Sequence, residues 1–208
     1  MPHLLKLDVS PRGNQSVSRR LGQQFLADWQ GNHAGAQVTT RDLATSNLPF
    51  VDLQWIGGAY SAPDQHTPEH KAALKVSNDL IAELMAADHL LITTPMYNFA
   101  IPAALKAWID HMVRVNVTFA ITPEGGYKGL IVGKKATVIT TSSGDYAPGA
   151  PAESYDQEIP YLRLILGFVG ITDVTFIRGG GTMAISMGKT SPEAFTAKLE
   201  PELASAAR

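Results

Sequence analysis

Cysteine is absent from all 208 residues. Its absence rules out disulfides, Cys-ligated zinc, iron–sulfur clusters and thiol nucleophiles, and it favours a reducing compartment. The formal net charge is only -2, and no run of basic residues is longer than a pair such as Lys134-Lys135, which argues against a nucleic-acid-binding surface. No apolar stretch reaches the ~18 residues of a membrane helix, and the first residues lack the charge pattern of a signal peptide. We therefore expect a cytoplasmic protein with no membrane or nucleic-acid partner.

Hydrophobic residues make up 45% of the chain and charged residues 17%, which is typical of globular proteins. A chain of this length can bury a substantial core. Because no repeat, low-complexity tract or linker interrupts it, we expect one domain spanning residues 1–208.

Short apolar segments with β character alternate with helical patterns along the chain. Strands are predicted at residues 4–9, 37–43, 88–93, 135–141 and 173–177, and helices begin near residues 16, 68, 101, 156 and 192. This alternation requires a parallel sheet with right-handed crossovers and helices on both faces. A three-layer flavodoxin-like α/β fold with strand order 2-1-3-4-5 fits best. The connections at residues 44–68 and 118–133 show no periodicity and are predicted to be long surface loops.

The chain is organised around residues 93–114, where the apolar strand ending in residues 90–92 passes through a short loop into a helix. The loop holds Pro95, Met96, Tyr97, Asn98 and Phe99. Open parallel sheets bind ligands at such loops, so we interpret this one as a binding loop for a flat, partly polar ligand. The alternative is a loop whose aromatic side chains only fill the core.

The helix that follows has one apolar face, and its other face carries Lys106, Asp110 and Arg114. These three charged residues are spaced at i, i+4 and i+8, so we expect them to pair in water.

The loop after the first strand carries Ser10, Arg12, Asn14, Ser16 and Ser18 at the start of a helix. Free amides and the helix dipole favour an anion there, and a phosphate monoester is the natural ligand. The alternative is that Ser16 only caps the helix. No Gly-x-Gly-x-x-Gly or complete Walker motif is present.

A third polar loop, Thr141, Ser142, Ser143 and Gly144, ends the fourth predicted strand. The three loops offer amides and hydroxyls rather than paired carboxylates, which suits FMN, a neutral ring system with a phosphate tail. The flavin would carry the hydride chemistry, so no side chain is assigned a catalytic role. No metal site is expected: His66 and His70 are interpreted as solvated. His111 is interpreted as structural or as part of a subunit contact.

The loop at residues 95–99 and the Leu-Lys helix after it resemble the FMN-dependent NADH azoreductases, also described as NADH:quinone oxidoreductases. The resemblance extends over nearly the whole chain, including Arg41-Asp42-Leu43 and the segment at residues 166–174. It implies a homodimer with one FMN per subunit at the dimer interface. It also implies ping-pong reduction, in which NADH or NADPH reduces FMN and leaves before a quinone or azo compound accepts two electrons.

The same resemblance assigns residues to the cofactor. The FMN phosphate would bind Ser10, Ser16, Val17 and Ser18; residues 96–99 would lie along the isoalloxazine, and residues 141–144 would meet its pyrimidine end. Many relatives have Ser-Arg-Gly-Gly at this last position, and some have Tyr where Ile121 stands. The substrate-pocket candidates are Phe99, Phe119 and Ile121, with Tyr127 as a further wall candidate, whereas Trp55 and Tyr60 are pocket, core or interface aromatics. A flavodoxin-type electron carrier and a redox-sensing FMN-binding protein are the alternatives.

Overall fold

Five parallel strands form one sheet in a computed structural model that describes residues 1–208. The strands lie in the order β2-β1-β3-β6-β7, and every neighbouring pair is parallel. The two remaining strands, β4 and β5, form a separate pair, so the order matches the predicted 2-1-3-4-5 in a different numbering. The sheet strands are β1 (His3–Asp8), β2 (Gln37–Asp42), β3 (His89–Pro95), β6 (Lys135–Thr141) and β7 (Asp173–Gly179).

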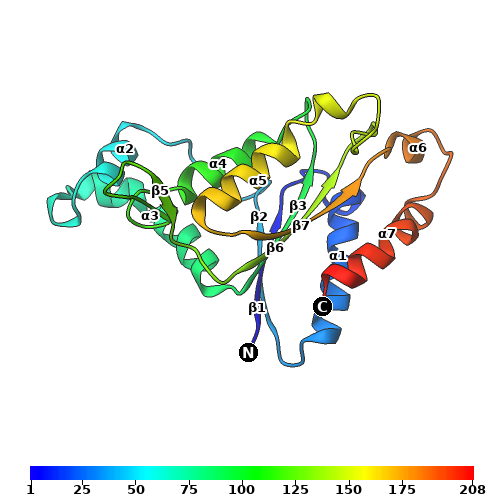
Figure 1. The fold of residues 1–208 in the computed structure, drawn as a ribbon, viewed down its shortest axis with the longest axis horizontal. Coiled ribbons are helices and arrows are strands. Elements are labelled where there is room, and N and C mark those ends of the chain that lie inside the picture. Colours follow the sequence, from blue (N-terminus) through cyan, green and yellow to red (C-terminus); the bar gives the residue numbers. More distant parts are fainter.

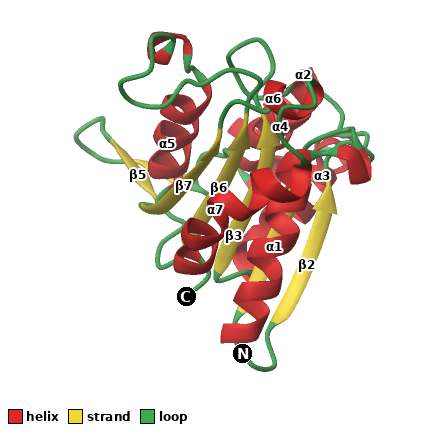
Figure 2. Ribbon diagram, turned by 90° about the vertical axis from the view of Figure 1, so that its right-hand side faces the viewer, coloured by secondary structure: helices red, strands yellow, loops and turns green.

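Helices cover both faces of the sheet (Figures 1 and 2). One face packs against α1 (Val17–Asn32) and α7 (Pro192–Ala206), and the other against α3 (Pro68–Ala86), α4 (Ala103–Met112) and α5 (Glu158–Val169). Successive strand residues point to opposite faces: Leu4 and Leu91 join the α1 side, whereas Leu5 joins the α4 side. Burial on both faces is why the central strands β1 and β3 are rich in apolar residues, whereas the edge strand β2 is polar and has no buried residue.

Three of the predicted helix starts are capped as the sequence indicates. The side chains of Ser16, Thr67 and Ser191 accept hydrogen bonds from the first-turn amides of α1, α3 and α7. In α3 and α7 a proline follows the cap, where its missing N–H costs nothing.

The prediction of two long structureless loops is wrong. Residues 44–68 contain α2 (Leu53–Tyr60), which Asp52 caps by accepting a 2.8 Å hydrogen bond from the Trp55 amide. Trp55 is buried against Leu74 of α3, so tertiary packing stabilises a helix too short to form alone. Residues 118–133 contain the antiparallel hairpin of β4 (Phe119–Ile121) and β5 (Tyr127–Gly129). A short helix, α6 (Met183–Ser186), was also not predicted.

The predicted pairing along one face of α4 is confirmed for Lys106 and Asp110 and is wrong for Arg114. Lys106 Nζ lies 2.5 Å from Asp110 Oδ1, as expected for an i,i+4 pair. Arg114 does not join them: α4 ends at Met112, and Arg114 turns into the interior, where its exposure is 8%. No helix of the protein combines the length and apolar character that crossing a membrane requires.

Candidate functional site

The loop between β1 and α1 places small hydroxyl side chains at the start of a 16-residue helix. Ser10, Ser16 and Ser18 are all buried, and the hydroxyls of Ser16 and Ser18 lie 3.1 Å apart. The amides of Val17 and Ser18 donate to no acceptor in the chain. Unpaired amides at the positive end of a helix dipole are the usual elements of a phosphate site.

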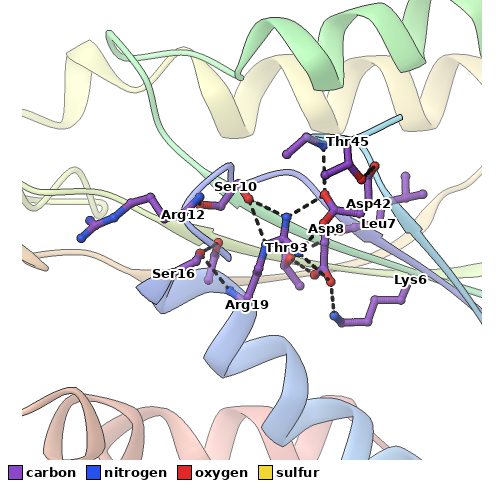
Figure 3. A network of polar contacts seen from close by, with 12 residues as sticks. Lys6, Leu7, Asp8, Ser10, Arg12, Ser16, Arg19, Asp42, Thr45 and Thr93 are labelled. Atoms are coloured by element: carbon purple, nitrogen blue, oxygen red, sulfur yellow. Dashed lines mark hydrogen bonds and ion pairs between the residues drawn. The ribbon is translucent and has the colours of Figure 1, made fainter. Parts of the chain in front are cut away.

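Arg19 holds this loop in place through hydrogen bonds from its guanidinium (Figure 3). Its guanidinium donates two hydrogen bonds, of 2.9 and 2.6 Å, to the Ser10 carbonyl. It also donates bidentately to the Asp42 carboxylate, at 2.8 and 2.7 Å. The hydrogen bonds from Arg19 lower the pKa of Asp42. The charge of Arg19 is therefore neutralised inside the network, and the guanidinium acts as a rigid support for the loop.

A second ion pair lies beside the first. Lys6 Nζ is 2.5 Å from Asp8 Oδ2, and both side chains are buried. Thr93 Oγ1 donates a 2.7 Å hydrogen bond to Asp8 Oδ1, which joins the ends of β1 and β3. The charges of Lys6 and Arg19 thus balance those of Asp8 and Asp42. Neither carboxylate is left unpaired beside the loop between β1 and α1.

The loop after β3 forms a tight turn with a strained backbone. Tyr97 and Ala100 exchange backbone hydrogen bonds of 2.9 and 3.1 Å, and the two residues between them, Asn98 and Phe99, have φ of 50° and 71°. Positive φ at both central positions defines a type I′ turn. Asn tolerates this conformation, but for Phe it costs on the order of 1–3 kcal/mol. Strain of this kind concentrates at ligand sites.

Two hydrogen bonds from other segments hold the turn in place. The Met96 amide donates to the Thr141 carbonyl at 2.8 Å, and the Gln157 amide donates to the Phe99 carbonyl at 2.9 Å. The turn is therefore attached both to the end of β6 and to the residue preceding α5.

A buried acid lies next to this attachment. Glu158 is fully buried, and its Oε1 accepts a 3.2 Å hydrogen bond from Thr94 Oγ1. Its Oε2 has no hydrogen-bond partner. Burial raises the pKa of Glu158 to about 8, so the side chain is mostly a neutral carboxylic acid at pH 7.

A cavity of about 240 Å³ lies between the predicted binding loops. Its walls bring the second and third loops together, with side chains from Met96, Asn98, Phe99, Ser142, Ser143 and Tyr146. Sequence reasoning missed Tyr146, whose ring meets that of Phe99 edge-on at 5.9 Å, and Tyr155, which lies 5.3 Å from Phe99. Both follow Gly144 in a polar stretch without periodicity, so only their aromatic character could have marked them.

The structure does not bring the other pocket candidates to this cavity. Phe119 packs against Phe168 at 4.7 Å in the hairpin region, and Ile121 is exposed. Their assignment to a substrate pocket stays a prediction. Trp55 belongs to the core of α2 and α3, and Tyr60 is exposed.

The histidines make no metal cluster. The rings of His66 and His70 are 6.3 Å apart, and no group of three His, Asp or Glu side chains is arranged to hold a metal ion. His111 is buried, with Nε2 2.8 Å from the Pro49 carbonyl, a contact within the chain.

Comparison with known proteins decides the family. Residues 2–203 match a family model described as a flavodoxin-like fold. A protein of Trichormus variabilis named FMN-dependent NADH:quinone oxidoreductase 2 is 46% identical over 207 residues, which cover 99% of this chain and 98% of the relative. The chain belongs to the FMN-dependent NADH:quinone oxidoreductase family.

Other similar proteins agree with this placement. A member of the FMN-dependent NADH:quinone oxidoreductase family from Jannaschia sp. is 46% identical over the full length of both chains. The crystal structure of an azoreductase from Bacillus anthracis superposes with a TM-score of 0.88 at 28% identity, covering 100% of this chain and 99% of that one. The similarity therefore extends over the whole chain.

Proposed function

We propose that the protein is an FMN-dependent oxidoreductase that uses NADH or NADPH to reduce quinones and azo compounds by two-electron transfer. The observation that carries this proposal is the position of the binding loops: those after β1, β3 and β6 leave the same edge of the sheet. β1 and β3 are hydrogen-bonded neighbours whose chains continue into helices on opposite faces. A crevice at such a switch point is where open α/β sheets bind their cofactors.

The residues at the N-terminus of α1 fit a phosphate monoester. The free amides of Val17 and Ser18 and the hydroxyls of Ser10, Ser16 and Ser18 would hold it. All of these groups can donate hydrogen bonds to oxygen, and the neighbouring carboxylates are already paired.

The residues around the 240 Å³ cavity fit the edge and face of a flavin ring. FMN, when bound, supplies the hydride chemistry. The chain would orient it, with residues 95–99 along the ring and Thr141, Ser142, Ser143 and Gly144 at its pyrimidine end. The type I′ turn and its attachments to Thr141 and Gln157 fix the backbone of this wall before any ligand binds.

A homodimer would complete the site. The cavity in one chain is smaller than the ~300–1,000 Å³ of most small-molecule sites. The hairpin carrying Phe119 and Ile121 lies apart from it and exposes Ile121 and Tyr127. A second copy would thus bring its Phe119 and Ile121 over the ring as substrate-pocket walls, with one FMN per subunit.

Spectroscopy and steady-state kinetics test the proposal. The purified protein with FMN should absorb near ~370 and ~450 nm, features of the flavin, and NADH under nitrogen should bleach both bands. Initial rates with NADH and benzoquinone or methyl red should give parallel double-reciprocal lines, as ping-pong kinetics require. Failure to bind FMN would refute the assignment, and FMN binding without steady-state turnover would identify an electron carrier instead.

A further inference from the structure

Arg114 is a buried cation without an anionic partner. Its exposure is 8%, and no carboxylate lies within ion-pair distance. The guanidinium Nη1 donates to the neutral side chains of Asn78, at 2.5 Å, and Ser77, at 3.3 Å. Burial lowers the pKa of Arg114, and no neighbouring charge offsets it.

The other well-buried cations of this protein do have such partners. Lys6 pairs with Asp8, and Arg19 pairs with Asp42. A buried charge left uncompensated costs several kcal/mol. The positive charge of Arg114 is therefore not neutralised by any acid of the chain, and part of its hydrogen-bonding potential has no acceptor.

The unused capacity lies on one edge of the guanidinium. Neither Nε nor Nη2 donates a hydrogen bond, and Nε is enclosed. Because Nε is enclosed, Nη2 is the nitrogen that remains free to donate, and a hydrogen bond from a charged guanidinium to a carboxylate or phosphate oxygen is a strong one. The backbone that carries it is rigid, because Arg114 N donates to Thr118 Oγ1 at 2.8 Å and the Arg114 carbonyl accepts from the Thr118 amide at 2.9 Å.

Arg114 lines a cavity of about 340 Å³ that is separate from the flavin-binding loops. The other walls are residues 58–63 at the end of α2, His66, and residues 115–117. Two carbonyls at this end of α2 already have partners: Ser61 Oγ donates to Gly58 O, and His66 Nε2 lies 3.3 Å from the carbonyl of Ser61, the residue after α2. Figure 1 places α2 at one end of the long axis, far from the loop between β1 and α1.

We propose that this cavity is a binding site for a small carboxylate or phosphate anion, held by Nη2 of Arg114 with Asn116 as a second contact. The volume admits a small organic acid or phosphate ester rather than a dinucleotide. The site would act independently of the flavin, and the proposal does not depend on the assigned activity.

Calorimetric titration of the full-length protein with sodium phosphate, and separately with sodium citrate, tests the proposal. Each titration is matched for ionic strength with chloride and is run with and without excess FMN. We expect saturable binding of at least one anion in both FMN conditions. Arg114→Gln should weaken it by about tenfold or more, since a charge-assisted hydrogen bond is lost. Arg114→Lys keeps the charge but loses the planar guanidinium that Asn78 holds, so it should also weaken binding. Arg163→Gln is the control because Arg163 is exposed and lies over the Phe176 ring.

Asn116→Gly keeps the test decisive if Arg114→Gln does not fold. Asn116 has φ of 61°, a conformation that glycine adopts freely, so this variant should fold and should bind the anion more weakly. Absence of saturable binding in the wild type would overturn the proposal. The proposal would also be overturned by phosphate binding that FMN abolishes and that Arg114→Lys leaves unchanged. Such binding would take place at the loop between β1 and α1. If no anion binds and Arg114→Lys shifts a dimer toward monomer in light scattering, the partner of Arg114 is a second copy and the proposal is wrong.

Discussion

Glu158 should make the folded protein lose stability as the pH rises. Its pKa is about 8 in the folded state because of burial, against 4.5 for an ordinary glutamate. Between these two values the folded chain keeps a proton that the unfolded chain has released. The unfolded state therefore binds fewer protons, and the free energy of unfolding falls with increasing pH. The loss begins above pH 4.5 and is nearly complete above about pH 8.

The size of this effect follows from the two pKa values. Each pH unit over which the protonation states differ is worth about 1.4 kcal/mol. Integrated from about pH 5 to about pH 9, Glu158 removes roughly 4 kcal/mol from the free energy of unfolding. Glu158→Gln has nearly the same shape and does not ionise. Its free energy of unfolding minus that of the wild type should therefore become more positive by roughly 4 kcal/mol over this range.

Urea unfolding at each pH unit between about 5 and 9, at a constant excess of FMN, measures this difference directly. Subtracting the two proteins cancels every other titrating group that the variant leaves unchanged. Glu153→Gln, which removes an exposed carboxylate from the same segment, should stay within about 0.5 kcal/mol of the wild type at each pH. If wild type and Glu158→Gln instead run parallel over the whole range, Glu158 is ionised in the fold and the argument from burial fails.

Substitutions at four further positions test the site and the fold. Ser16→Ala and Ser191→Ala each remove a helix cap, at about 0.5–2 kcal/mol in urea unfolding, but only Ser16→Ala should weaken FMN binding, by about tenfold in fluorescence titration; equal affinities would remove Ser16 from the phosphate site. Phe99→Gly should be more stable than Phe99→Ala by about 1 kcal/mol, because both lose the ring and only glycine tolerates the positive φ; the reverse order in urea would contradict the strain. Gly129→Ala should cost about 1–3 kcal/mol in urea unfolding, because its Cβ would lie 2.3 Å from the Gly170 amide nitrogen. A minimal loss would mean that the hairpin does not pack against the end of α5.

Periodicity and capping were sufficient to predict the parallel sheet and its principal helices. Alternating apolar residues place strand side chains on two faces, and caps such as Ser16 and Thr67 start their helices by local hydrogen bonds. These signals are local, so they can be recognised along the chain. The positions of the predicted binding loops could be located for the same reason, because each follows a strand with an apolar pattern.

The missed elements depend on contacts between distant residues. α2 forms because Trp55 packs against Leu74, and the hairpin at residues 119–129 is held where Gly129 meets the backbone at Gly170. Neither contact has a signature within its own segment. The same is true of Tyr146, which reaches Phe99 only in the folded chain.

The sequence by itself determined the order of the five sheet strands and the principal helices, the apolar faces and the positions of the polar loops after the strands. Only the tertiary structure decided the environment of each charge. Arg114 was predicted to lie on an exposed helix face and is buried without an acid, and Glu158, which no sequence pattern marked, is buried as well. The physical reason is that hydrophobic pattern is a property of neighbouring residues, whereas desolvation of a charge depends on every segment that packs around it.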